Sequence, residues 1–352
     1  MNTTTTPIPS PVLEAWGLHD GSWQIIPFGT GLINHTWKLE RGNEALILQR
    51  INHNVFKTPH DIAHNMTLIG DFLQQHHPSY HFVAVKPTLQ GQPLFFVAGH
   101  GYYRVFPFVQ GSHTIDVVNT PGQAFEAARQ FGLFTKMLTS LDVSKLRTTI
   151  PGFHDLTSRY QQFLKALETG DRDRRRDSAE LIQQVISFSD IVTKFEAIRK
   201  NPDFKLRVIH HDTKISNVLF NNEQKAVCVI DLDTVMPGYF ISDLGDMMRT
   251  YLSPVSEEEK DIEKINVRAG FYKAIMEGYL SAMKPVLSQA ELDHAFYSGQ
   301  FMIFMQAIRF LTDHLQNDVY YGAAYPGHNF HRARNQLTLL SRLTAHEKDW
   351  TN

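Results

Sequence analysis

Three oxygen-bearing side chains flank two short apolar runs near the middle of the chain. The runs, Asn217–Phe220 and Ala226–Ile230, are rich in β-branched and aromatic residues and are separated by a polar turn, which predicts a β-hairpin. Asp212 and Asn217 lie at the entry of the first run, and Asp231 follows the second. A hairpin brings its two open ends together, so we expect these three side chains to converge. Such a set suits a hard cation that keeps several waters and binds phosphate oxygens.

The spacing of these residues favours phosphoryl transfer. In His210-x-Asp212-x4-Asn217 followed by Ile230-Asp231, one aspartate would accept the proton of a substrate hydroxyl while the asparagine and the second aspartate hold Mg²⁺. We therefore predict that Asp212 is the catalytic residue and faces the acceptor hydroxyl, and that Asn217 and Asp231 are Mg²⁺ ligands. His210 is expected to brace the loop. The alternative is a buried hairpin whose loop aspartates cap turns.

This segment resembles the aminoglycoside phosphotransferase and choline kinase branch of the protein-kinase-like fold, because its H-x-D form lacks the arginine of protein kinases. The resemblance implies an α+β protein with two lobes, an antiparallel β-rich N-lobe and a mostly helical C-lobe that carries the catalytic hairpin. It also implies ATP and Mg²⁺ as cofactors. Two aspartates lie beyond the hairpin, and one of them, Asp243 or Asp246, is expected to fix the backbone after the metal-binding aspartate.

The elements that would position the motif fall into two regions with different predicted secondary structure. Before residue 110 the pattern predicts helices at 13–18 and 59–72 and strands at 23–28, 44–51, 82–87, 93–98 and 102–109. Beyond it the pattern is helical outside the hairpin, with helices expected over 124–138, 151–164 and 179–200. We predict a tail and short helix over residues 1–20, a nucleotide-covering N-lobe over 21–109 and a catalytic and substrate-binding C-lobe over 110–352.

A glycine turn in the N-lobe precedes the H-x-D motif by some 180 residues. Glycines allow a tight turn and a close backbone approach to phosphate, so Gly29, Gly31 and Asn34 are expected to bind the nucleotide. Phe106 and Phe108 are expected to present backbone groups to the adenine, just before a hinge at residues 111–112. The alternative for that last strand is a simple edge strand stopped by its proline.

The strand Glu44–Ile51 contains no lysine, although protein kinases place their phosphate-anchoring lysine on the equivalent strand. Gln49 and Arg50 are the candidates for this role. They point to opposite faces of the sheet, and Gln49 has the better register. The missing lysine leaves a nucleotide-binding pseudokinase as an alternative to an enzyme.

Several further runs look like those of N-acetylhexosamine 1-kinases. They include D-L-D-T-V-M-P-G, D-L-G-D-M-M-R, R-F-L-T-D-H-L-Q-N-D-V-Y-Y and H-R-A-R-N-Q-L, with L-Q-R-I-N-H-N-V-F and G-F-H-D in the N-terminal half. By that resemblance Arg309 and Tyr320 would contact the sugar, with Tyr321 as a further substrate-binding residue. Arg309 and Asp313 are also four residues apart on one predicted helix, where they could form an ordinary surface ion pair.

Composition is compatible with a small-molecule enzyme. A net charge of −2 gives no reason to expect nucleic acid or a membrane as a partner, and one cysteine excludes an internal disulfide. The Thr- and Pro-rich start lacks a signal-peptide pattern, so a cytoplasmic protein is expected. The best expectation is a kinase acting on the anomeric hydroxyl of an N-acetylhexosamine. Choline, homoserine, methylthioribose and aminoglycosides remain alternative substrates.

Overall fold

The computed structural model describes residues 8–29 and 33–351, which form two compact units. The first unit contains the N-terminal segment through His113, together with Ser140–Pro151 and Leu219–Pro237. The second contains Thr114–Thr139, Gly152–Val218 and the chain from Gly238 onward. Both units are therefore assembled from segments that are distant in sequence. The predicted division at residues 109 and 110 stays a prediction.

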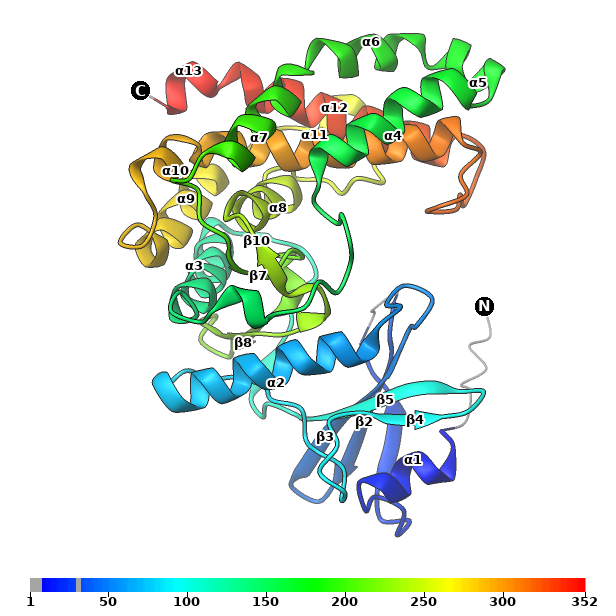
Figure 1. Cartoon of the computed structure of the whole chain (residues 1–352), viewed down its shortest axis with the longest axis vertical. Helices are drawn as coiled ribbons and strands as arrows, with labels where there is room; N and C mark the ends of the chain where they lie inside the picture. Colours follow the sequence, from blue (N-terminus) through cyan, green and yellow to red (C-terminus); the bar gives the residue numbers. More distant parts are fainter. Residues whose placement is uncertain (1–7, 30–32, 352) are drawn as a thin grey trace. The chain divides into compact units, whose positions relative to one another are not determined.

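The first unit is built on an antiparallel five-stranded sheet of order β1-β2-β3-β5-β4. Its strands are β1 (Gln24–Pro27), β2 (His35–Arg41), β3 (Glu44–Ile51), β4 (Phe95–Val97) and β5 (Gly101–Pro107) (Figure 1). Because successive side chains of each strand point in opposite directions, the sheet has two distinct faces. Trp37, Leu39 and Leu48 are buried in one core with Val12 and Trp16, which belong to or follow the short helix α1 (Ser10–Ala15). Polar side chains such as Thr36 occupy the opposite face.

The helix α2 (Pro59–His76) begins with a proline at its first helical position, where the missing N–H costs nothing. The chain that follows it was predicted to form a strand over Phe82–Pro87, and this prediction is wrong. Only Lys86 makes an isolated bridge, to Val105. The segment instead runs along α2, with Phe82 packed so closely on Gly70 that a Cβ there would lie 3.0 Å from its ring. Pro87 ends the segment and Pro78 precedes it, and neither can donate an N–H group to a ladder.

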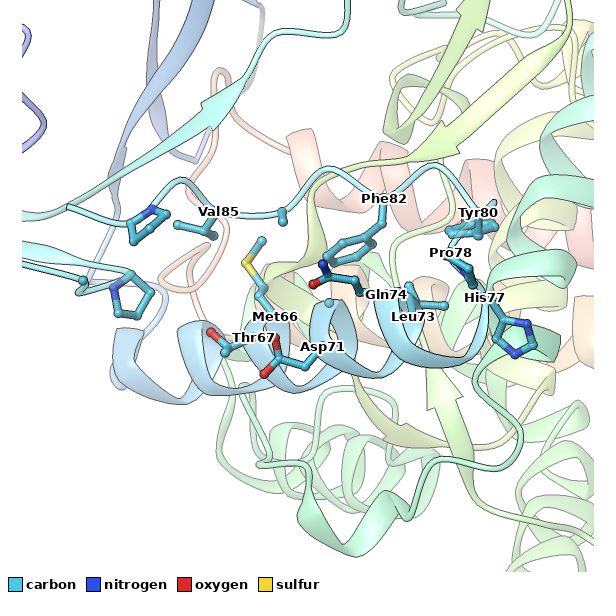
Figure 2. Close-up of a pocket in the computed structure, with 15 residues that line it drawn as sticks. Met66, Thr67, Asp71, Leu73, Gln74, His77, Pro78, Tyr80, Phe82 and Val85 are labelled. Atoms are coloured by element: carbon cyan, nitrogen blue, oxygen red, sulfur yellow. The ribbon is translucent and has the colours of Figure 1, made fainter. Parts of the chain in front are cut away.

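A groove of about 670 Å³ lies between α2 and residues 78–93. Figure 2 shows Met66 and Gln74 of α2 facing Phe82 and Val85 across it. The predicted site residues do not line this groove.

The predicted hairpin is confirmed as β8 (Val218–Asn221) and β9 (Ala226–Val229), which form a three-stranded sheet with β6 (Ser112–His113). A single 3-10 turn, Leu232–Thr234, follows β9, and the strand β10 (Met236–Gly238) comes next. The buried Asn65 of α2 holds this region, because its Nδ2 donates to the carbonyl oxygens of Val235 (2.9 Å) and Arg147 (2.8 Å).

The second unit is helical apart from short strands. Its helices are α3 (Pro121–Met137), α4 (Leu156–Thr169), α5 (Arg172–Asp177), α6 (Ala179–Ser187), α7 (Asp190–Lys200), α8 (Ile241–Tyr251), α9 (Ala269–Met283), α10 (Gln289–Asp293), α11 (Ala295–Leu315), α12 (His328–Ala345) and α13 (Glu347–Trp350). The predicted helix over 179–200 is thus two helices. Of the helices in the described residues, none is both long and apolar enough to span a bilayer.

The helix α11 is the centre of the second unit. It is buried almost all around and packs against α4, α8 and α12 (Figure 1). Its contact with α8 requires a glycine, because a Cβ on Gly245 would lie 2.1 Å from the carbonyl oxygen of Ser298. This close approach fixes α8, which carries Asp243 and Asp246.

Candidate active site

The loop that carries Asp212 follows the buried strand β7 (Arg207–Ile209) and is held by two carboxylates of α8. Asp243 accepts hydrogen bonds from the backbone N–H groups of His210 (3.0 Å) and His211 (2.7 Å). Asp246 accepts one from the N–H of Thr213 at 2.8 Å. The two aspartates therefore brace the loop around Asp212, rather than the segment after Asp231 where the sequence placed their role.

Burial makes these two carboxylates unusual acids. Asp243 is fully buried, and this burial raises its pKa to about 7, although the N–H groups of His210 and His211 favour the charged form. Burial also raises the pKa of Asp246, against the opposing charge of Arg249, whose Nε lies 2.9 Å from its Oδ1. The nearby Asp212 raises both pKa values further. The loop of Asp212 therefore rests on a compact group of acidic side chains.

His210 lies inside the second unit, with no exposed surface. Its ring packs edge-to-face on Phe131, with centroids 5.1 Å apart. Its Nδ1 lies 3.4 Å from the N–H of Asp212, which donates to it. Both contacts are those of a residue that holds the loop, which is the role predicted for His210.

Asp212 itself is half-buried, and its Oδ2 lies 3.1 Å from the ammonium of Lys214. Asn217 is 3% exposed, and its Nδ2 donates to the carbonyl oxygen of Asp212 at 2.9 Å. This bond fixes the amide so that Oδ1 is the atom left to take a cation. Lys214 was not singled out from the sequence, although it lies only two residues after the predicted catalytic residue Asp212.

Asp231 belongs to the first unit, so its convergence with Asp212 and Asn217 stays a prediction. Its carboxylate is exposed at the end of β9, and its backbone is left-handed, with φ of 61°. One oriented amide oxygen and one exposed carboxylate are the hard donors that Mg²⁺ prefers, with water and phosphate completing its shell. Within residues 8–29 and 33–351, no group of three His, Cys, Asp or Glu side chains forms a metal site of its own. Taken one by one, the amide oxygen of Asn217 and the carboxylate of Asp231 are each of the donor type that suits this cation.

The polar face of the five-stranded sheet carries Arg104, which the sequence analysis did not identify. Its guanidinium donates to Asp233 Oδ1 at 2.5 Å and, through Nε and Nη2, to Gln49 Oε1 at 3.1 and 2.9 Å. Gln49 is therefore used within the sheet. Arg50 lies on the opposite face, opposite His35 and Tyr103 in the ladder, so the two candidates for the missing lysine are separated as predicted.

Other predicted nucleotide-binding residues lie on or near this polar face. Asn34 donates to Asp233 Oδ2 at 2.8 Å, and its own Oδ1 accepts the N–H of Asn52. Gly29 has a φ of 79°, which favours glycine, whereas Gly31 lies outside the described residues. Phe106 lies 5.1 Å from Arg104, measured from ring centroid to guanidinium carbon.

Phe108 packs edge-to-face on Phe28, with centroids 5.9 Å apart. The ammonium of Lys38 lies 4.0 Å from the Phe108 ring centroid. Lys38 is thus a further cation on this face. The sequence could have indicated it, because Lys38 lies between two apolar residues, Trp37 and Leu39, that point to the other face of the same strand.

Arg309 faces aromatic rings and does not pair with Asp313. Its guanidinium carbon lies 5.7 Å from the ring centroid of Phe153 and 5.4 Å from that of Tyr321, and its Nη1 donates to Gln306 at 3.1 Å. Phe153 stacks on His154, which contacts the ring of His211, the neighbour of Asp212 in sequence. A continuous set of contacts within the second unit therefore links Arg309 to the loop of Asp212.

The loop after α11 is held by Asp313. Its carboxylate accepts the N–H groups of Tyr320 (2.7 Å) and Tyr321 (2.9 Å) and the Nδ2 of Asn329 (3.0 Å). Tyr320 is 67% exposed, whereas Tyr321 is largely buried and lies against Arg309. Of the two predicted tyrosines, Tyr321 is the one that lies beside Arg309.

Positive charge accumulates beside Arg309. Burial, followed by the charges of His211, Arg309, Arg249 and Arg159, lowers the pKa of His154 well below its usual value, so this imidazole is neutral near pH 7. Burial and Arg309 also lower the pKa of Arg159. His154 Nδ1, Arg159 Nε and Arg309 Nε are buried without a hydrogen-bond partner among the described residues. Such nitrogens are suited to a polar ligand.

Comparisons with known proteins show the family and the fold of the chain. The profile of the phosphotransferase enzyme family matches residues 24–286. An aminopropanol kinase structure is similar over 97% of both chains, at 14% identity and a TM-score of 0.68.

A spectinomycin phosphotransferase in complex with ADP and spectinomycin is 16% identical, with 97% of this chain and 99% of that chain covered and a TM-score of 0.59. A choline/ethanolamine kinase family protein from Mesorhizobium loti is also 16% identical, covering 96% of both chains with a TM-score of 0.54. The chain therefore belongs to the phosphotransferase enzyme family and has the protein-kinase-like fold.

Proposed function

We propose that this chain is a small-molecule kinase that transfers the γ-phosphoryl group of ATP to a hydroxyl of an uncharged sugar. Our best candidate for the acceptor is the anomeric hydroxyl of an N-acetylhexosamine. Asp212 orients that hydroxyl and takes its proton late in the transfer. Asn217 and Asp231 hold a divalent cation, expected to be Mg²⁺, which when bound neutralises the charge of the β- and γ-phosphates.

The remaining residues position these groups. His210, Asp243 and Asp246 hold the loop of Asp212, which supports in-line positioning without a covalent nucleophile. The Lys214 ammonium lies near enough to Asp212 to offset repulsion between that carboxylate and the phosphate oxygens. In the first unit, Gly29, Gly31, Asn34, Gln49, Arg50, Phe106 and Phe108 remain the proposed nucleotide-binding residues.

The observation that carries the choice of acceptor is the positive charge of Arg159 and Arg309, which lie close enough to lower the pKa of the neutral His154. Aminopropanol, choline and aminoglycosides are cations, and a cluster of guanidinium groups would repel them. A neutral, hydroxyl-rich molecule can instead accept hydrogen bonds from guanidinium nitrogens and stack a C–H face on an aromatic ring.

Among the described residues near Arg309, the aromatic rings and carboxylates that a cationic acceptor would need already have partners within the chain. A quaternary ammonium requires aromatic faces, but Phe153 and Tyr321 both lie against Arg309. A polycation requires free carboxylates, but Asp313 is taken by the N–H groups of Tyr320 and Tyr321, and Glu257 pairs with Arg249. The choline and aminoglycoside alternatives are therefore disfavoured.

The proposed test is an ATP-consumption panel with N-acetylglucosamine, N-acetylgalactosamine, choline, aminopropanol and spectinomycin. We expect turnover with an N-acetylhexosamine and a ³¹P signal of an anomeric phosphate in the product. Turnover only with the cationic compounds would overturn the choice of acceptor and leave the kinase assignment intact. If the protein neither binds ATP nor consumes it with any of these compounds, the enzyme assignment would be overturned.

The Arg309→Leu variant tests the residue that carries the argument. It should lower kcat/KM for the sugar by about 10- to 150-fold, because charged hydrogen bonds worth about 1.5–3 kcal/mol are lost. ATP affinity should not change. The matched control is Arg199→Leu, because Arg199 of α7 also lies over a ring, Phe195, at 5.8 Å. Equal effects of the two variants would show that Arg309 has no part in sugar binding.

A further inference from the structure

The ion pair between Arg104 and Asp233 is not used by the chemistry proposed above, yet it is one of the most buried in the first unit. Each residue is 1% exposed, and the Nη1–Oδ1 distance is 2.5 Å. Burying two charges costs several kcal/mol unless hydrogen bonds satisfy the whole pair. The arrangement of those hydrogen bonds indicates what the pair does.

All three guanidinium nitrogens of Arg104 have partners. Nε and Nη2 donate to Gln49 of β3, and Nη1 contacts both Asp233 and the sulfur of Met66 at 3.7 Å. Both oxygens of Asp233 are also used, one by Arg104 and the other by Asn34. Asp233 therefore has no oxygen turned toward a metal ion, although it lies only two residues from Asp231.

The segment anchored by this pair includes a backbone conformation that needs support. Asp231 is left-handed, which costs a non-glycine residue free energy and persists where the surroundings determine it. The turn Leu232–Thr234 follows immediately, and Asn65 of α2 holds the Val235 carbonyl at its end. The carboxylate of Asp233 is thus the internal anchor of the turn that presents Asp231.

We propose that Arg104 and Asp233 are positioning residues for the carboxylate of Asp231. The ion pair fixes the turn Leu232–Thr234 on the polar face of the sheet, and Gln49 and Asn34 extend this fixed geometry to strands of the proposed nucleotide site. This inference rests on the proposed function, in which Asp231 holds the divalent cation. It also explains why Gln49 occupies the expected lysine position, since a lysine there would add a second buried cation beside Arg104.

A matched ion pair in the second unit allows this role to be separated from simple stabilisation. Arg207 and Glu291 are also buried, with an Nη1–Oε1 distance of 2.5 Å and side chains 5% and 0% exposed. Glu291 lies in α10, where it also closes the helix cap at Ser288. Removing its charge should destabilise the fold as removing that of Asp233 does, without affecting the turn at Asp231.

The test compares Asp233→Asn, Arg104→Lys and Glu291→Gln in Mn²⁺ titrations of the protein with ADP, followed by the electron paramagnetic resonance signal of free Mn²⁺. The first two variants should weaken Mn²⁺ binding by about 10- to 100-fold, as is typical when a group that orients a metal ligand is changed. Glu291→Gln should lower the melting temperature and leave Mn²⁺ affinity unchanged. If Asp233→Asn does not fold, Arg104→Lys, which keeps the positive charge, decides the question.

Unchanged Mn²⁺ affinity in folded Asp233→Asn or Arg104→Lys would overturn the inference. The Asp231→Ala variant makes that failure distinguishable from failure of the proposed function. If Asp231→Ala loses Mn²⁺ binding while Asp233→Asn keeps it, only the positioning role is wrong. If Asp231→Ala binds Mn²⁺ normally, the metal role of Asp231 is wrong and the inference falls with it.

Discussion

At the scale of single residues, the proposed chemistry depends on side chains that fix the backbone around Asp212. Two buried carboxylates of α8 accept the N–H groups of the loop, and His210 fills the space behind it. Asp212 itself stays half-buried beside Lys214. Phosphoryl transfer needs positioning and charge neutralisation more than bond-making by the protein. A carboxylate on a rigid loop next to an ammonium group supplies both.

Asp212→Asn tests whether this carboxylate acts as the proton acceptor. We expect kcat to fall by about 10²- to 10⁴-fold, because the amide cannot take the proton of the acceptor hydroxyl. Binding of Mg·ADP should persist, since Asn217 and Asp231 are unchanged, and its effect on the melting temperature provides the internal control. Near-normal turnover by the variant would show that Asp212 is not the proton acceptor. If the wild-type protein is as inactive as the variant, the pseudokinase alternative would be favoured.

The residues that could be found from the sequence are those whose spacing the chemistry dictates. Asp212, Asn217 and Asp231 follow from one motif and one strand. Arg104 and Asp233 do not, because they are 129 residues apart and their pairing depends on how β5 and the turn after β9 fold together. The signal that was present is an arginine inside the apolar run Y-Y-R-V-F, where a buried charge requires a partner.

At the scale of elements, a strong alternation of apolar and polar residues predicted strands correctly, whereas a weak alternation did not. The strand β3 covers the predicted residues Glu44–Ile51. The strand β8 is shifted by one residue from its predicted run, and β9 ends one residue before the end of its own. Residues 82–87 have strand-like composition, yet prolines and packing on α2 keep them out of the sheet. The predicted helix over 179–200 breaks at Phe188 and Ser189, and the second helix begins with the acidic Asp190 in its first turn, which is favourable at a helix N-terminus.

The helix α8 gives the enzyme a testable dependence of stability on pH. Because burial raises the pKa of Asp243 to about 7, the folded state binds more protons than the unfolded state between pH 4 and 7. The contribution of Asp243 to the free energy of unfolding must therefore fall as pH rises through this window, on the order of 1–4 kcal/mol. Urea titrations at several pH values should show wild type losing stability relative to Asp243→Asn as pH increases.

The control for that measurement is Asp116→Asn, since Asp116 is exposed. Its effect on the free energy of unfolding should be small beside that of Asp243→Asn, because an exposed surface side chain has few partners to lose. If wild type instead gains stability relative to Asp243→Asn as pH rises, the hydrogen bonds from His210 and His211 outweigh burial, and the carboxylate is held charged.

At the scale of the whole molecule, the net charge is only −2, yet the two proposed sites differ in local charge. The second unit gathers Arg159, Arg309 and neutral His154 around the proposed acceptor site. The first unit balances Arg104 against Asp233 and leaves Asp231 exposed. The proposed sugar contacts and the proposed nucleotide contacts of the sheet thus belong to different compact units, each with its own core.

This division predicts distinct hydrogen-exchange footprints for the two ligands. Mg·ADP should slow exchange in residues 35–51, 101–108 and 226–235, because it binds the sheet and the turn at Asp231. N-acetylglucosamine without nucleotide should slow exchange in residues 151–164 and 306–322, which contain His154 and Arg309. At about 100 times Kd, amides that exchange through opening of the bound site should slow by up to about 100-fold. Arg309→Leu should erase the sugar footprint and keep that of Mg·ADP. A sugar footprint centred on residues 35–51 would mean that the acceptor binds the first unit, and the assignment of Arg309 would then be wrong.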